Sequence, residues 1–406
     1  MTTAGHILRA NTSATTVGST RMSLPLLAGF FFAFRSCISY LGFQSDPRTG
    51  AAVSLGCSGL LLIAALLSTM GDDQFSMRLM FASRTLRWLW AYLAVTGLSV
   101  LWTGAESPAV AGGYWAGMVM DVVTALLLIK PPDIAKRTDA LMKGFVVGTL
   151  FVAAVAWLSP TLPDLRIGNE EFLHPNWLGL ICALSFFFAQ HLASEERVWK
   201  WCCVALGITL LRSISKTAIA AFLIAEGFYL LREKQVTRRA KVAIAAALAV
   251  VVAAFWNLLE AYFEVYSTTG NSTETLTGRT IIWAMALSAG IERPWFGHGL
   301  YSYRALIPPV GTFEASHAHN ELLQQFFEFG ALGVAVTVGL YLSLFLNAKR
   351  SAPSRFGKLA QVIVIFSVIR GLADTLNFGL SLPLWLFAAF GIALAQQRED
   401  LEASAA

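Results

Sequence analysis

The chain has 406 residues, of which 56% are hydrophobic and only 14% are charged, and its mean hydropathy is +0.61. These values exclude an ordinary soluble globular protein and indicate a polytopic membrane protein. The formal net charge is +5. Because most basic residues fall in short loops on one side of the predicted membrane, this charge does not indicate a nucleic-acid-binding surface.

Apolar runs predict twelve membrane-spanning helices, since a hydrocarbon layer of about 30 Å is crossed by roughly 20 apolar residues. The runs lie near residues 24–42, 51–69, 86–103, 111–130, 142–160, 176–194, 198–212, 214–231, 240–259, 322–348, 357–373 and 378–397. The sequence therefore predicts an all-α, polytopic fold of about 12 transmembrane helices in a single integral membrane domain, residues 1–406.

The distribution of Lys and Arg predicts the orientation, because these residues favour short cytoplasmic loops. With the N-terminus inside, 21 of the 30 basic residues lie in inner loops and tails, eight lie outside and Arg35 lies within a span. The tails, residues 1–23 and 398–406, are then cytosolic. The first 23 residues are polar and lack a small-residue cleavage site, so no removable signal peptide is expected.

A long segment, residues 260–318, is expected on the periplasmic face between the ninth and tenth spans. It is too rich in apolar residues for a disordered linker. Within it, Thr280 is expected to cap a helix that begins at Ile281 and ends at Pro294. Such a helix is expected to lie along the membrane surface.

Eight basic residues depart from the inner-side preference: Arg48, Arg166, Arg212, Lys216, Arg279, Arg293, Arg304 and Arg370. Guanidinium groups bind phosphate oxygens through paired hydrogen bonds, so cations held at the outer face fit a lipid-linked pyrophosphate. For any one of them alone, pairing with a headgroup or with an acid such as Asp164 or Glu292 is an alternative.

The stretch SHAHNELLQQFFEFGALG, from Ser316, places His319 and Asn320 at the start of a membrane helix. A neutral imidazole can accept a proton from an attacking hydroxyl, and Asn320 can hold a sugar hydroxyl or cap the helix. The alternative is that Asn320 or Ser316 caps the helix and His319 rests at the headgroup level.

The helix that follows carries Glu321, Gln325 and Glu328 on one face, which is expected to border a wet cavity. Gly330 and Gly333 permit close helix packing or a local break.

A metal site is not expected from the sequence. His298, His317 and His319 have no acid or cysteine at a recognisable ligand spacing, and His-x-His alone is a weak signal. The charges in apolar runs, among them Asp374, are functional candidates in a membrane protein, but pairing within the bundle explains them nearly as well.

Taken together, the motifs resemble the superfamily of O-antigen ligases and Wzy-type polymerases, which includes exopolysaccharide polymerases of the ExoQ kind. The motifs are FLHPNWLG from Phe172, SISKTAIAAFLIA from Ser213, TGRTIIW from Thr277, RPWFGHGLYSYR from Arg293, and HAHNELLQQFFEFGALG from His317. They cover mainly residues 170–335, and His319, Asn320, Gly330 and Gly333 resemble the ligase signature of His-Asn followed by paired glycines.

The resemblance implies a GT-C-like glycosyltransferase of the bacterial inner membrane that takes a glycan from an undecaprenyl-pyrophosphate carrier, without metal or other cofactor, at the periplasmic face. It implies two catalytic residues. Arg279 would bind the pyrophosphate leaving group, and His319 would activate or position the acceptor hydroxyl. The second basic site of the family falls on Lys216, where the family has Arg, with Arg212 one turn earlier. Asn320, Arg304 and His317 complete the candidate substrate-binding residues.

The resemblance also implies the surrounding membrane lipids as partners. Two acceptors fit the implied chemistry. Another lipid-linked repeat makes the protein a polymerase of an exopolysaccharide or O-antigen, which the HPNWLG and Ser-Lys-Thr motifs favour slightly. Lipid A core makes it an O-antigen ligase. A transporter of the same lipid-linked glycan is less favoured, because it predicts inverted repeats and a polar site at the membrane midplane.

Overall fold

The computed structural model describes residues 14–70, 80–81, 83–169, 172–232, 237–239, 241–243, 246, 276–309, 315–351, 354–375 and 383–405. Within these ranges the chain forms helices and no strands. The principal helices are α1 (Ala14–Gly42), α2 (Pro47–Thr69), α3 (Arg84–Ser99), η2 (Val100–Trp102), α4 (Pro108–Leu128), α5 (Ile134–Leu158), α6 (Pro175–Leu192), α7 (Val198–Arg212), α8 (Lys216–Arg232), α11 (Leu276–Glu292), α12 (Tyr303–Leu306), α13 (Glu321–Arg350), α14 (Arg355–Gly371) and α15 (Leu384–Ala405).

A helix covers most of each predicted span wherever the structure describes it, and the span predicted at 240–259 lies largely outside the described residues. Helix α15 continues beyond the last predicted span to Ala405. In the described part of the chain, five helices are long and apolar enough to cross a membrane by themselves: Leu24–Gly42, Pro47–Thr69, Pro108–Leu128, Ile134–Leu158 and Glu321–Arg350. The all-helical architecture fits a polytopic membrane protein. The full count of 12 spans stays a prediction.

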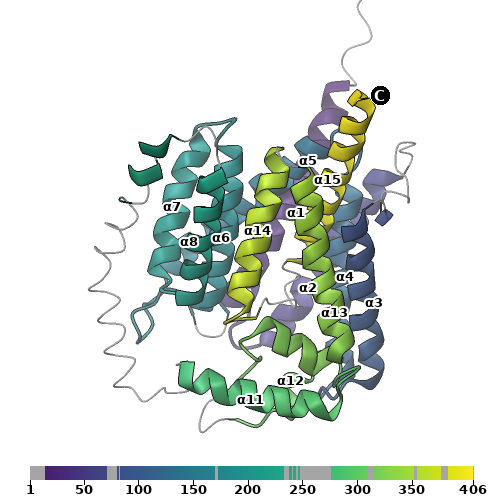
Figure 1. Ribbon diagram of the computed structural model, residues 1–406, viewed down its shortest axis with the longest axis vertical. Coiled ribbons are helices and arrows are strands. Elements are labelled where there is room, and N and C mark those ends of the chain that lie inside the picture. Colours follow the sequence, from purple (N-terminus) through teal and green to yellow (C-terminus); the bar gives the residue numbers. More distant parts are fainter. Residues whose placement is uncertain are drawn as a thin grey trace, which may run out of the picture.

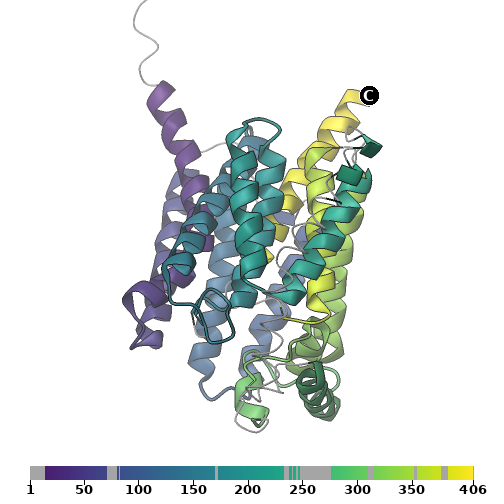
Figure 2. The ribbon, with the colours of Figure 1, turned by 90° about the vertical axis from the view of Figure 1, so that its left-hand side faces the viewer.

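The long helices run side by side in one bundle (Figures 1 and 2). Helix α1 begins, and α15 ends, at the end of the bundle opposite α11. Small residues allow the closest crossing, between α1 and α5. A Cβ atom on Gly29 would lie 1.9 Å from the Leu141 carbonyl oxygen, and one on Gly144 would lie 1.9 Å from that of Leu26. Glycine at these two positions therefore lets the backbones touch.

Helix α11 crosses the end of the bundle instead of running along it (Figure 1). Its expected position along the membrane surface stays a prediction. A small core of its own, separate from the main one, joins α11 and α12 to the start of α13; it contains Ile282, Ala286, Tyr303, Ile307, Ala315, Ala318 and Phe327. The expected cap at Thr280 is wrong, because α11 already begins at Leu276. Thr280 lies inside the helix.

Helix α13 contains a break at Gly330, whose φ of 64° is one that side chains other than glycine rarely adopt. The loop around Trp295 forms hydrogen bonds with the backbone groups that this break leaves without a partner inside the helix. The Ala331 amide donates to the Pro294 carbonyl at 2.7 Å, and the Gly299 amide donates to the Glu328 carbonyl at 2.7 Å. The RPWFGHG and FGALG motifs therefore meet, and the local break is the role that the structure gives Gly330.

Candidate active site

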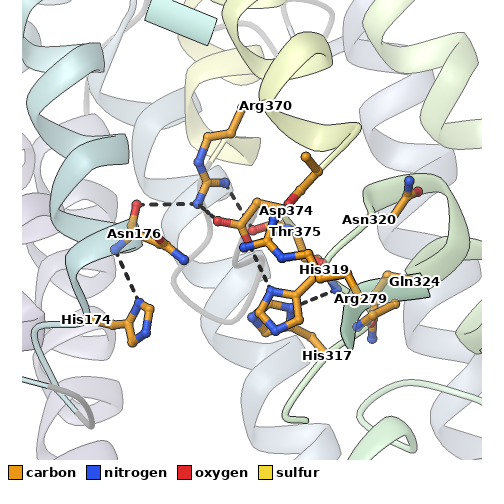
Figure 3. Close-up of polar contacts among 12 residues, drawn as sticks. His174, Asn176, Arg279, His317, His319, Asn320, Gln324, Arg370, Asp374 and Thr375 are labelled. Carbon is orange, nitrogen blue, oxygen red and sulfur yellow. Dashed lines mark hydrogen bonds and ion pairs between the residues drawn. The ribbon is translucent and has the colours of Figure 1, made fainter. Parts of the chain in front are cut away.

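His319 lies in a tightly held turn just before α13. Its backbone has a φ of +48°, and its amide donates to His317 Nδ1 at 3.1 Å. The preceding residue, Ala318, is buried, and its amide donates to Gln324 Oε1 at 2.8 Å. The imidazole is therefore placed by fixed neighbours on both sides, as Figure 3 shows.

Asn320 acts as the N-cap of α13. Its Oδ1 accepts a hydrogen bond from the Leu323 amide at 3.1 Å, and its Nδ2 donates to the Leu372 carbonyl at 2.9 Å. The capping alternative is thus the arrangement found for Asn320, while a role in binding substrate stays a prediction. The second bond ties the start of α13 to the turn that follows α14.

That turn brings Asp374 to His319. The Asp374 Oδ1 and His319 Nδ1 atoms are 3.6 Å apart, an ion-pair distance that is longer than a hydrogen bond. Asp374 is 2% exposed. Its Oδ2 accepts from Arg370 Nη2 at 2.7 Å, and its Oδ1 accepts from the Thr375 amide at 2.9 Å. Asp374 belongs to the site, a role that the sequence alone did not distinguish from simple pairing within the bundle.

The charges around Asp374 set its protonation. Burial alone would raise the pKa of this carboxyl group, but Arg370 and the contact with His319 outweigh burial and hold the pKa below its ordinary value. For His317, burial and the neighbouring His319 hold the imidazole pKa well below its ordinary value. At neutral pH Asp374 is thus a carboxylate that faces His319, and the neighbouring His317 is neutral.

Arg370 links this cluster to Asn176 at the start of α6 (Figure 3). Its guanidinium donates to the Thr375 carbonyl at 3.1 Å and to the Asn176 carbonyl at 3.4 Å. Asn176 Oδ1 in turn accepts from Ser215 Oγ at 3.0 Å. The motifs FLHPNWLG and SISKTAIAAFLIA therefore meet at the site, and His174, which caps α6, is part of the same group.

The two predicted phosphate-binding groups contact different segments of the chain. Arg279, on α11, donates to the carbonyl of Ala373, directly before Asp374. Arg212, at the end of α7, donates to the carbonyl of Leu165, and Lys216 is exposed at the start of α8. Arg304 is exposed on α12, and no described contact joins it to His319.

Unusual backbone conformations gather around these residues. In the described part of the chain, the residues other than glycine with positive φ are Leu165, Ile214, Tyr301 and His319. Leu165 supplies the carbonyl that binds Arg212, Ile214 lies between Arg212 and Lys216, and Tyr301 lies in the YSYR motif. Such conformations persist only where the surroundings impose them, and they concentrate at functional sites.

The polar face of α13 packs against protein, so the expectation of a wet cavity is wrong for most of it. Gln325 donates to Glu321 at 3.0 Å and to the Tyr92 hydroxyl at 3.3 Å. Glu328 accepts from the Tyr301 amide at 3.0 Å. These buried bonds hold α13 against α3 and against the Tyr301 loop. His298 is likewise structural, since it contacts the Ala289 carbonyl at 2.9 Å and stacks on Phe327.

An apolar cavity of about 400 Å³ lies between α13 and α14 and reaches the site at Glu321 and Leu372. Most of the side chains that line it are aliphatic or aromatic, among them Val338, Tyr341 and Ile365. The cavity thus ends beside Asn320, which contacts Leu372.

Fold and site together define a multi-pass membrane protein with a cationic, histidine-containing site at one end of its bundle. Residues 201–338 match the model of the O-antigen ligase family. The chain is also similar to the exopolysaccharide production protein ExoQ of Rhizobium meliloti (strain 1021), with 24% identity over 290 residues. That match covers 65% of this chain and 65% of the relative, slightly less than two thirds of the relative's length.

Both comparisons support the superfamily of O-antigen ligases and ExoQ-like proteins, so the resemblance drawn from the motifs is confirmed. The region that matches the family model contains Arg212, Lys216, Arg279 and His319, whereas Asp374 lies beyond it. The family match and the apolar helices together point to a multi-pass bacterial membrane protein.

Proposed function

We propose that the protein transfers a glycan from an undecaprenyl-pyrophosphate carrier to a hydroxyl group at the periplasmic face of the inner membrane. The observation that carries the proposal is that one turn, Ala373 and Asp374, contacts both Arg279 and His319. One group there can accept a proton, and a cation beside it can bind a leaving phosphate.

On the donor side, Arg279 binds the pyrophosphate. A guanidinium carries five N–H donors, and the Ala373 carbonyl takes one of them. Arg212 and Lys216 supply further positive charge from the ends of α7 and α8. As the bond between the anomeric carbon and the phosphate oxygen breaks, negative charge develops on the departing pyrophosphate, and these cations stabilise it. In this proposal no metal ion is required for the reaction.

On the acceptor side, His319 takes the proton. The acceptor hydroxyl oxygen attacks the anomeric carbon, and its hydrogen passes to the imidazole as the new glycosidic bond forms. Asp374 orients the ring through Nδ1 and stabilises the imidazolium, which leaves Nε2 for the hydroxyl. Arg370 is a positioning residue, because it fixes the Asp374 carboxylate from the side away from His319.

The lipid part of the donor fits the apolar cavity between α13 and α14. A polyprenyl chain is a long hydrocarbon, and the cavity is lined by apolar side chains and ends beside Asn320 and Leu372. A chain lying there would bring its pyrophosphate to the site end of both helices, next to Ala373 and Arg279. Burial of the chain contributes roughly 0.8 kcal/mol per CH₂ group.

We favour another lipid-linked repeat as the acceptor, so that the protein polymerises an exopolysaccharide or O-antigen, because the curated relative is an exopolysaccharide production protein. Ligation onto lipid A core is the second candidate, favoured by the description of the matching family as O-antigen ligase. Both reactions use the same donor site.

The test incubates the purified protein with a lipid-linked repeat, with and without lipid A core. Chain growth in the absence of core supports the polymerase, and transfer that occurs only when core is present supports the ligase. Absence of both products with intact donor lipid would overturn the proposal.

A further inference from the structure

The side chains of His317, His319 and Asp374 form a group with the chemistry of a metal site. One ligand atom from each lies within 4.8 Å of the others. Two imidazoles and one carboxylate form a common ligand set for zinc, with a fourth position left open. The acid that the sequence did not supply near His-x-His comes from the turn after α14.

The three donors are held from two separate segments of the chain. His317 and His319 belong to the loop before α13, which is buried through Ala318. Asp374 is fixed by Arg370 and by the Thr375 amide. Both segments are also joined through Asn320 and the Leu372 carbonyl. The group is therefore largely formed before any ion arrives.

The lone pairs needed for metal binding are present. His319 Nδ1 is buried and has no hydrogen-bond partner among the described residues. His317 Nδ1 accepts a hydrogen bond from the His319 amide at 3.1 Å, so this nitrogen carries a lone pair. Arg370 holds Oδ2 of Asp374 at 2.7 Å, and a second oxygen held by a hydrogen bond is usual for carboxylates that bind metals.

The movements required are small. Bonds of about 2.0 to 2.1 Å to Zn²⁺ place tetrahedral ligand atoms about 3.4 Å apart, so the three atoms must approach one another by at most about 1.4 Å from their separation of up to 4.8 Å. If its Nδ1 is the ligand atom, His317 exchanges the hydrogen bond that it accepts from the His319 amide for the bond to the ion.

We propose that His317, His319 and Asp374 bind a divalent transition-metal ion of the zinc type and that the bound ion inhibits glycan transfer. The ion holds His319 and Asp374 in a ligand geometry in which the imidazole no longer accepts the acceptor's proton. Inhibition rests on the proposed function; binding does not.

Binding is measured first, with Co²⁺ as a visible probe for the full chain in detergent and without substrate. We expect one Co²⁺ per chain with an absorption band typical of low coordination number, displaced by Zn²⁺. His317→Gln, whose side-chain oxygen can still accept the His319 amide hydrogen, should weaken binding at least about tenfold.

The matched control is His191→Gln. His191 also contacts an acid, Asp139, at 3.2 Å, but among the described residues no second histidine is grouped with them. This variant should bind Co²⁺ like the unaltered protein. Absence of the Co²⁺ band in the unaltered protein, or equal affinity in His317→Gln, would overturn the proposal.

Two measurements on the unaltered protein do not depend on how a variant folds. X-ray absorption of bound Zn²⁺ should show two imidazoles and oxygen, and a sulfur ligand or a single imidazole would contradict the site. Zn²⁺ should lower glycan transfer at least about tenfold, with recovery after chelation. If no glycan is transferred even without metal, the proposed function fails, but the binding result still stands. If saturating Zn²⁺ leaves transfer unaffected, the inhibition fails, but the proposed function stands.

Discussion

Replacement of Asp374 by Asn tests whether the carboxylate holds His319 in its working position. The carboxylate is 2% exposed and faces His319 Nδ1 at 3.6 Å. Asn keeps the size of the side chain and the acceptor for the Thr375 amide, but it has no charge to stabilise an imidazolium. In serine proteases the corresponding change lowers kcat by roughly 10⁴. Because the contact here is longer, we expect a loss of about 10² to 10³.

The same change also affects stability, so transfer must be counted per folded molecule. Arg370 is 3% exposed and loses its counter-charge in Asp374→Asn. An unpaired buried charge costs about 3 to 5 kcal/mol. The folded fraction is measured by thermal unfolding in detergent, and transfer is measured in proteoliposomes with intact donor lipid.

Two matched controls separate these effects. Asp121→Asn removes the charge from another buried pair, with Arg35; it should lower stability but leave transfer per folded molecule unchanged. Asp139→Asn alters the other histidine–aspartate contact, with His191, and should leave transfer unchanged. If Asp374→Asn transfers glycan within about twofold of the unaltered protein per folded molecule, Asp374 does not orient His319.

Further predictions concern Asn320, His174 and the apolar cavity. Asn320→Ala should lower the free energy of unfolding by about 1 to 2 kcal/mol because a helix cap and a second hydrogen bond are lost, whereas Asn320→Asp should keep the cap; unchanged unfolding in the alanine variant would contradict the capping role. Burial and Arg166 lower the pKa of His174 to about 4, against opposing effects of Asp374 and Asp164 and a further lowering by His319. Between that value and the ordinary value of about 6.5 the unfolded chain binds more protons, so acidification from pH 7 to pH 5 should lower stability by about 1 to 2 kcal/mol, and His174→Gln should reduce this dependence; an equal dependence in the variant would contradict it. Val338→Trp, which fills the cavity between α13 and α14, should raise KM several-fold for a long polyprenyl donor and little for a short one. If the variant and the unaltered protein have equal KM values for the long donor, the cavity is not its binding site.

The sequence predicted most of the helices, because apolar runs and the positions of Lys and Arg are local signals. It also predicted His319 and Arg279 as site residues, from their motifs. The contact between His319 and Asp374 has no local signal. It depends on α14 returning beside α13, so that the turn after α14 reaches the start of α13.

Two further features could be recognised only in three dimensions. Gly330 suggested either packing or a break, and the choice depends on the loop at Trp295, which supplies partners for the broken backbone. The start of α11 at Leu276 displaced the expected cap at Thr280, because the helix continues back beyond the apolar stretch that defined it. The buried ion pair between Arg370 and Asp374 did have a signal in the sequence. The two residues are four positions apart at the end of a predicted span, a spacing at which side chains on a helix can pair.

The central claim is that the group around Arg279 and His319 transfers a lipid-linked glycan, and the most direct measurement compares single variants in one membrane assay with intact donor lipid. Arg279→Ala and His319→Ala should each lower transfer by at least about 10² while membrane insertion is unchanged. Arg293→Ala, an exposed arginine just after α11, should transfer glycan normally. Near-normal transfer by Arg279→Ala or His319→Ala would contradict the account.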